Sequence, residues 1–106
     1  MTLEEFLRGA LLDEPYTDNS RAAQAEAADR LEARDCYVAW EVRVPDRGDG
    51  RPGRVDLVAH HADYGWFALE IDRKTPRRKS ARKLRSLPSP GFVLLRVGPR
   101  LVKVDG

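Results

Sequence analysis

Residues 53–74 decide the fold, and they run Gly53-Arg-Val-Asp-Leu-Val-Ala-His-His-Ala-Asp-Tyr-Gly-Trp-Phe-Ala-Leu-Glu-Ile-Asp-Arg-Lys74. On both sides of the central Ala-Asp-Tyr-Gly, apolar residues alternate with others, which is typical of half-buried β-strands joined by a turn. We therefore predict strands over residues 54–60 and 66–72, with the turn centred on Asp63. In that register Asp56 and Glu70 stand opposite each other, because they lie symmetrically about the centre.

The flanking residues complete a mixed fold. Helical patterns cover residues 1–12 and 20–34, and the second helix can be capped by Asp18, Asn19 or Ser20. A strand is predicted over residues 37–44, with Val38, Trp40, Val42 and Val44 on one face and Trp40 in the core, before a Gly- and Pro-rich loop over 45–53. Thr75 and Pro76 predict the N-cap and first residue of a helix that ends near residue 87, and strands follow over 92–97 and 101–104. The expected class is α/β, of the α+β mixed-sheet kind.

Length and composition are those of one small domain. The chain has 106 residues and one cysteine, so we expect a single domain over 1–106 without an internal disulfide. No apolar stretch is long enough for a membrane span, and the first residues lack a basic, apolar leader pattern. We expect a soluble cytoplasmic protein with no membrane association and no organic cofactor.

Positive charge is concentrated in the second half of the chain. Residues 1–50 hold 12 acids and 6 bases, a net charge of −6, whereas residues 51–106 hold 5 acids and 13 bases, a net charge of +8. Eight of those bases lie in residues 73–85, which contain no acid. A basic cluster of this kind suits phosphates, so nucleic acid is the expected partner; the alternative is a solvated helix face. The candidate phosphate contacts are Arg73, Arg77, Arg78, Lys79, Arg82 and Lys83.

Carboxylates recur on the less apolar side of the three predicted central strands. They are Glu41, Asp56, Glu70 and Asp72. Two like charges opposed across a strand pair destabilise a sheet unless a cation or a raised pKa compensates them. A hard divalent ion such as Mg²⁺ would provide that compensation and could activate water against a phosphodiester. The alternative is ordinary ion pairs with Arg43, Arg54 or Arg73.

The element order and the acids resemble those of the PD-(D/E)XK nucleases, the restriction-endonuclease-like superfamily. Gly53-Arg-Val-Asp56-Leu-Val-Ala is similar to the family's first motif, and Phe67-Ala-Leu-Glu70-Ile-Asp72-Arg-Lys74 is similar to its second. The resemblance covers about residues 20–97 and implies an αβββαβ core, preceded here by an extra N-terminal helix and turn over residues 1–18. If Glu70 is the family's second acid, the chain departs from the pattern at Asp72, which stands where the lysine is expected. If Asp72 is the second acid, Asp72-Arg73-Lys74 fits the motif, but Asp72 pairs less well with Asp56 in the predicted register, so we prefer Glu70 as the ligand.

The resemblance also implies a catalytic set. Asp56 and Glu70 would bind Mg²⁺ or Mn²⁺, Asp72 would be a further ligand or position a water, and Lys74 would place an ammonium near that water. Glu26, on the helix over 20–34, and Glu41 are additional candidate ligands. Glu26 could equally be a solvent-facing helix residue, and Glu41 a partner of Arg43.

We therefore expect a metal-dependent endonuclease that hydrolyses nucleic-acid phosphodiester bonds, with DNA as the expected substrate. The alternative is a nucleic-acid-binding module on a nuclease-like fold that has lost catalysis through Asp72. A homodimer would let so small a chain cut both strands of a duplex.

Overall fold

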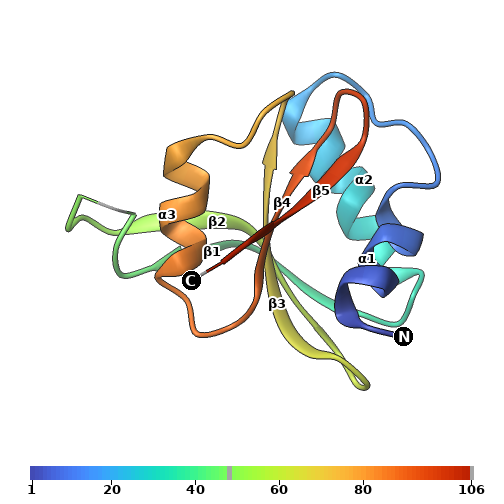
Figure 1. The fold of residues 1–106 in the computed structure, drawn as a ribbon, viewed down its shortest axis with the longest axis horizontal. Helices are drawn as coiled ribbons and strands as arrows, with labels where there is room; N and C mark the ends of the chain where they lie inside the picture. The colour runs from blue at the N-terminus through green and yellow to red at the C-terminus, as the bar shows by residue number, and fades with distance from the viewer. Residues whose placement is uncertain (48, 106) are drawn as a thin grey trace.

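The computed structural model describes residues 1–47 and 49–105, and it contains three helices and one sheet (Figure 1). The helices are α1 (Leu3–Leu11), α2 (Ser20–Glu32) and α3 (Arg78–Arg85). The strands are β1 (Tyr37–Val44), β2 (Gly53–His61), β3 (Gly65–Asp72), β4 (Gly91–Leu95) and β5 (Arg100–Val104). The predicted mixed class and element order are confirmed. No helix in the described part of the chain has the length and apolarity needed to cross a membrane.

The five strands lie in the order in which they occur along the chain. Neighbouring strands are antiparallel except β3 and β4, which are parallel and are joined by α3. The β2–β3 ladder runs from Leu57 opposite Leu69 to His61 opposite Gly65, so the hairpin is centred on Asp63. The predicted register is therefore confirmed, and it places positions 56 and 70 just beyond the last paired residues.

Helices cover both faces of the sheet and create two separate cores (Figure 1). The larger core joins α1 and α2 to the face that carries Leu57, Phe67 and Leu69. The smaller core joins α3, through Leu84, to Val55 and Val93 on the opposite face. Gly91 permits this packing, because a Cβ there would lie 2.8 Å from the Cβ of Leu84. The helices therefore cover one part of each face of the sheet.

The strands β1 and β2 change faces midway, which corrects the prediction that each keeps one apolar face. Val38 packs against the larger core, whereas Val44 belongs to the smaller one. Likewise Leu57 and Val55, only two residues apart, lie in different cores. The change coincides with Glu41, whose φ of 51° is in the left-handed region, and with the end of the β2–β3 ladder.

Two further predictions were wrong in detail. Trp40 is 45% exposed, so it is not a core residue. Helix α3 begins at Arg78 rather than Pro76, because Arg77 is still extended (φ −81°, ψ 148°) and acts as the N-cap in place of Thr75. Asn19 caps α2, as one of the predicted alternatives had it.

Candidate functional site

The carboxylates of Asp56 and Glu70 lie where β2 and β3 separate. Asp56 N–H donates to Glu70 Oε2 at 2.8 Å, and Ile71 N–H donates to Asp56 Oδ2 at 2.7 Å. Each carboxylate therefore accepts a main-chain N–H of the other strand, replacing the backbone bonds that the separating strands no longer make. Glu70 is fully buried and Asp56 is half-buried. Two acids are thus held together in the sheet at the change of faces.

Lys83 of α3 provides the positive charge nearest to this pair. Its Nζ forms an ion pair with Glu70 Oε1 and donates to the Arg54 carbonyl oxygen at 2.9 Å. The Lys83 side chain is only 17% exposed. Without this cation the buried Glu70 would face Asp56 without a compensating charge, which is unfavourable. Helix α3 therefore contributes directly to the site.

The pKa values of both acids are raised above their ordinary values. Burial is the main cause that raises the pKa of Glu70 to about 7, and the charge of Asp56 raises it further, against the opposing effect of Lys83. Burial also raises the pKa of Asp56, although the hydrogen bond from Ile71 partly opposes this shift. Acids whose pKa values are raised in this way are typical of metal and catalytic sites.

This shift predicts a dependence of stability on pH. Because the pKa of Glu70 is higher in the folded state than its ordinary 4.5, protonated Glu70 favours folding below pH 4.5, and this contribution is lost as pH rises through 7. We expect the free energy of unfolding to fall by about 3 kcal/mol from this group between pH 4 and pH 8 without metal. Urea unfolding of Glu70→Gln should lack this decrease, whereas exposed Glu32→Gln should retain it. Equal pH profiles for all three proteins would contradict the assignment.

Asp72 lies on the same side of the sheet but bonds to the start of α3. Its Oδ2 accepts Arg77 N–H at 2.8 Å, and its Oδ1 accepts Ser80 Oγ–H and Arg77 Nε–H, both at 2.9 Å. The Asp72 side chain is fully buried. The side chain of Arg77, the N-cap residue, makes no capping hydrogen bond to α3. Asp72, at the end of β3, instead accepts hydrogen bonds from the start of the helix. The metal role predicted for Asp72 stays a prediction.

The two additional candidate ligands differ in position. Glu26 accepts the N–H and hydroxyl of Thr17, so it ties α2 to the preceding turn. Glu41 accepts Gln24 Nε2 at 3.2 Å, and the same nitrogen donates to the Asp56 carbonyl oxygen at 2.9 Å. Gln24, rather than Glu26, is therefore the α2 residue that contacts the chain at Asp56.

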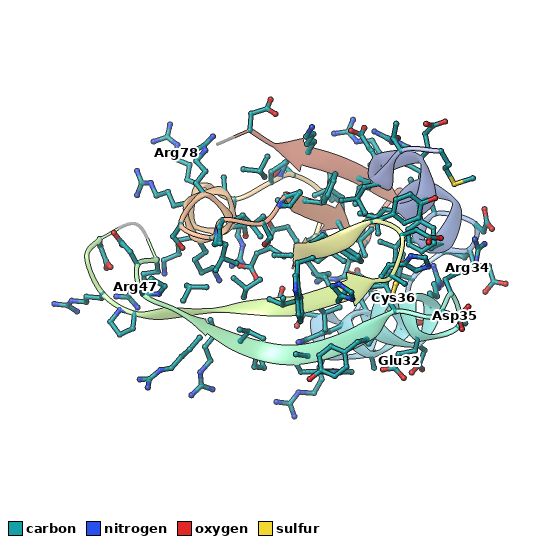
Figure 2. The ribbon with its side chains drawn as sticks, turned by 90° about the horizontal axis from the view of Figure 1, so that it is seen from below. Glu32, Arg34, Asp35, Cys36, Arg47 and Arg78 are labelled. Carbon is teal, nitrogen blue, oxygen red and sulfur yellow. The ribbon has the colours of Figure 1, made fainter. Side chains whose placement is uncertain are left out.

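The predicted basic residues also divide into groups. Arg73 pairs with Asp18, and Arg77 bonds to Asp72. Lys74 is exposed in the segment that follows β3, whereas Lys83 lies beside Glu70. Arg78, Lys79 and Arg82 are exposed on α3, and Figure 2 shows Arg78 pointing away from the sheet. The structure therefore brings Lys83, and not Lys74, to the acid pair.

The spacing of residues in α3 indicates that Lys83 faces the sheet, although the two motifs pointed to Lys74. Ser80 and Leu84 of α3 are buried, and Leu87, two residues after the helix, packs against the same core. Lys83 lies three residues after Ser80 and four before Leu87, so helical spacing places it on the same side. A lysine on the inward face of a helix requires an anionic partner, and Glu70 is that partner.

The described residues bring two carboxylates together, Asp56 and Glu70, and not a complete set of protein ligands for a metal. Within residues 1–47 and 49–105, no group of three or more His, Cys, Asp and Glu side chains is arranged to hold a metal ion. Mg²⁺ commonly takes one or two carboxylates and completes its shell with water and phosphate oxygens. The two carboxylates of Asp56 and Glu70 are a donor set of the kind and number that Mg²⁺ takes from protein.

Comparison of the chain with protein-family models, with curated proteins and with solved structures gave no match. The resemblance to the PD-(D/E)XK nucleases therefore remains a prediction from the two motifs and the order of elements.

Proposed function

We propose that this protein is a metal-dependent nuclease that hydrolyses phosphodiester bonds in nucleic acid, with DNA as the expected substrate. The observation that carries the proposal is the pair of acids, Asp56 and Glu70, held together beneath a strongly basic helix. The order of the elements from α2 to β4, with β3 and β4 parallel, also supports it, because it is the order expected of a PD-(D/E)XK core.

Asp56 and Glu70 are the residues that would hold Mg²⁺ or Mn²⁺. When bound, such an ion would polarise the phosphodiester and lower the pKa of a water molecule. Lys83 contributes the ammonium group at this site, the role that the motif comparison assigned to Lys74. In the metal-free protein Lys83 neutralises Glu70, and its second bond, to the Arg54 carbonyl, holds it beside the site.

Helix α3 would hold the nucleic-acid backbone. Arg78, Arg82 and Arg85 follow one another at helical spacing and are exposed, while Ser80 and Leu84 face inward. Arg78 and Arg82 also line a hollow of about 360 Å³ on the outer side of α3. Guanidinium groups suit phosphate oxygens, so a strand bound here would lie on the same helix that carries Lys83 to the acids.

The exposed arginines predict a binding defect that does not depend on sequence. In Arg78→Gln/Arg82→Gln we expect weaker binding to unrelated sequences, and a plot of log affinity against log salt that is shallower by about 0.7–0.9 for each lost contact. Fluorescence anisotropy at several salt concentrations measures both effects. Arg100→Gln/Lys103→Gln is the matched control, because it removes the same charge from exposed positions on β5. Equal salt slopes in all three proteins would show that the exposed arginines of α3 do not contact phosphates.

The second candidate function is nucleic-acid binding without catalysis. It is favoured by the ion pair between Lys83 and Glu70, which occupies one of the two acids in the metal-free protein. The two functions differ in whether a divalent ion binds at the pair and supports cleavage.

Incubation of labelled DNA and RNA, single-stranded, duplex and branched, with Mg²⁺ or Mn²⁺ tests the proposal. We expect cleavage that EDTA abolishes and thermal stabilisation by the metal at pH 8. Binding of nucleic acid without cleavage under any of these conditions would favour the second candidate.

A further inference from the structure

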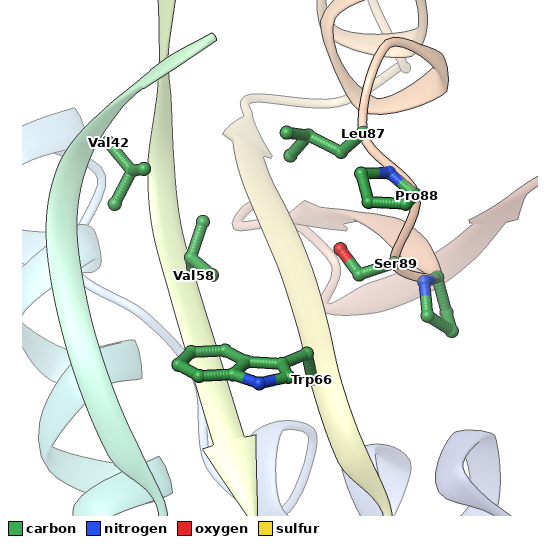
Figure 3. Close-up of a pocket in the computed structure, with 7 residues that line it drawn as sticks. Val42, Val58, Trp66, Leu87, Pro88 and Ser89 are labelled. Atoms are coloured by element: carbon green, nitrogen blue, oxygen red, sulfur yellow. The ribbon is translucent and has the colours of Figure 1, made fainter.

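An apolar hollow lies on the α3 side of the sheet. It measures about 500 Å³ and is lined by Val42, Val58, Trp66, Leu87, Pro88, Ser89 and Pro90. Figure 3 shows the indole of Trp66 at one end of this hollow, with Val42 and Val58 on one side and Leu87 and Pro88 on the other. Its volume lies within the range of small-molecule sites, so a flat ring can enter it.

Exposed aromatic residues extend the hollow along the sheet. Tyr37 is paired with His60 and His60 with Trp66 across three adjacent strands, so the three side chains form a row on one face. Tyr37 is 64% exposed and Trp66 is 51% exposed. The Trp66 ring lies 4.9 Å from that of His60 and 6.3 Å from that of Tyr37. Exposed aromatic rings grouped on one face beside an apolar hollow indicate a binding surface rather than a core.

The position of this surface relative to the acids and to α3 points to its occupant. Along β2, Val58 is two residues from Asp56, a distance of about 7 Å. Along β3, Trp66 is four residues from Glu70, or about 13 Å. Leu87 lies two residues after the end of α3, on which Arg82 and Arg85 are exposed. A ligand that combines flat apolar rings with closely spaced negative charges would match both the hollow and the arginines.

We propose that the hollow and the aromatic row bind unpaired nucleobases, so that the substrate is single-stranded nucleic acid or contains unpaired nucleotides. This inference rests on the proposed function, because it names the substrate class of the same site. Stacking on aromatic side chains requires exposed base faces, and the bases of an intact duplex are already stacked on one another. An apolar protein partner would fit the hollow but would gain nothing from the arginines beside it.

Binding measured in EDTA tests the inference without any catalysis. We expect the wild-type protein to bind a 20-nucleotide single strand at least about tenfold more tightly than a blunt duplex of equal length. Trp66→Ala should weaken single-strand binding about tenfold and duplex binding less than twofold, and Trp66→Phe should recover part of the loss. The matched control is Trp40→Ala, which removes the other exposed tryptophan, outside the hollow. A thermal melt of each variant verifies folding.

The outcomes separate this inference from the proposed function. Unchanged single-strand affinity in Trp66→Ala would overturn the base-binding role, even if metal-dependent cleavage occurs. A specific loss in Trp66→Ala, with no cleavage by the wild type in any metal, would support base binding and reject the nuclease. A self-associated protein that becomes monomeric in Trp66→Ala, without change in nucleic-acid affinity, would assign the hollow to a protein interface and overturn the inference.

Discussion

Asp56→Asn is expected to lower metal-dependent cleavage by about 10³-fold or more, because a ligand that stabilises the transition state through a metal contributes several kcal/mol. The asparagine oxygen can still accept the Ile71 N–H, so the fold should be retained. Glu70→Gln should lower cleavage to a similar extent. Its fold should also be retained, because the glutamine amide oxygen can still accept the Asp56 N–H. Rates from single-turnover cleavage at saturating enzyme measure the change.

The appropriate control is nucleic-acid affinity in EDTA. It should change less than about twofold in Asp56→Asn, because the acid serves the metal and the arginines of α3 hold the strand. Cleavage at the wild-type rate in either variant would remove these acids from the mechanism. A loss of stability above about 2 kcal/mol in EDTA would show that their main role is structural.

Asp72→Ala is expected to be strongly destabilising, with a loss of about 3–5 kcal/mol in the free energy of unfolding. It removes the acceptor for three hydrogen bonds from Arg77 and Ser80, and it leaves the buried Ser80 hydroxyl without this partner. The start of α3 would also lose its cap, since the N-cap residue Arg77 provides no side-chain bond. Denaturant unfolding in EDTA measures the effect.

Asp49→Ala is a useful comparison, because Asp49 also accepts hydrogen bonds and pairs with an arginine, but on the surface. We expect a loss below about 1 kcal/mol for that change. If Asp72→Ala were as mild and instead abolished metal binding, Asp72 would be a ligand, as the motif comparison predicted.

The hairpin register was predictable from the sequence because it depends on local information. The turn residues around Asp63 and the alternation on either side specify the pairing, and that pairing puts Asp56 opposite Glu70. The element order followed from the same kind of pattern. These features need no knowledge of how distant segments pack.

The change of faces in β1 and β2 was not predictable, because it depends on tertiary packing: residues of one strand pack against two different cores. Val42 and Val44 continue the alternation of Val38 in the sequence, yet a backbone change at Glu41 turns the later residues towards α3. The predicted start of α3 was wrong for a related reason. Thr75 and Pro76 are typical of a helix N-terminus, but Asp72 accepts the Arg77 N–H and the helix begins only at Arg78.

The crossed bonds between Asp56, Glu70 and the two backbones make the charge state of the site part of the sheet itself. The amides of Asp56 and Ile71 are held by carboxylates rather than by carbonyl groups, so their protection from hydrogen exchange depends on where those carboxylates lie. Any ion or proton that moves an acid also loosens or tightens the join between two central strands. Local opening of the backbone and the chemistry of the site are therefore one equilibrium rather than two.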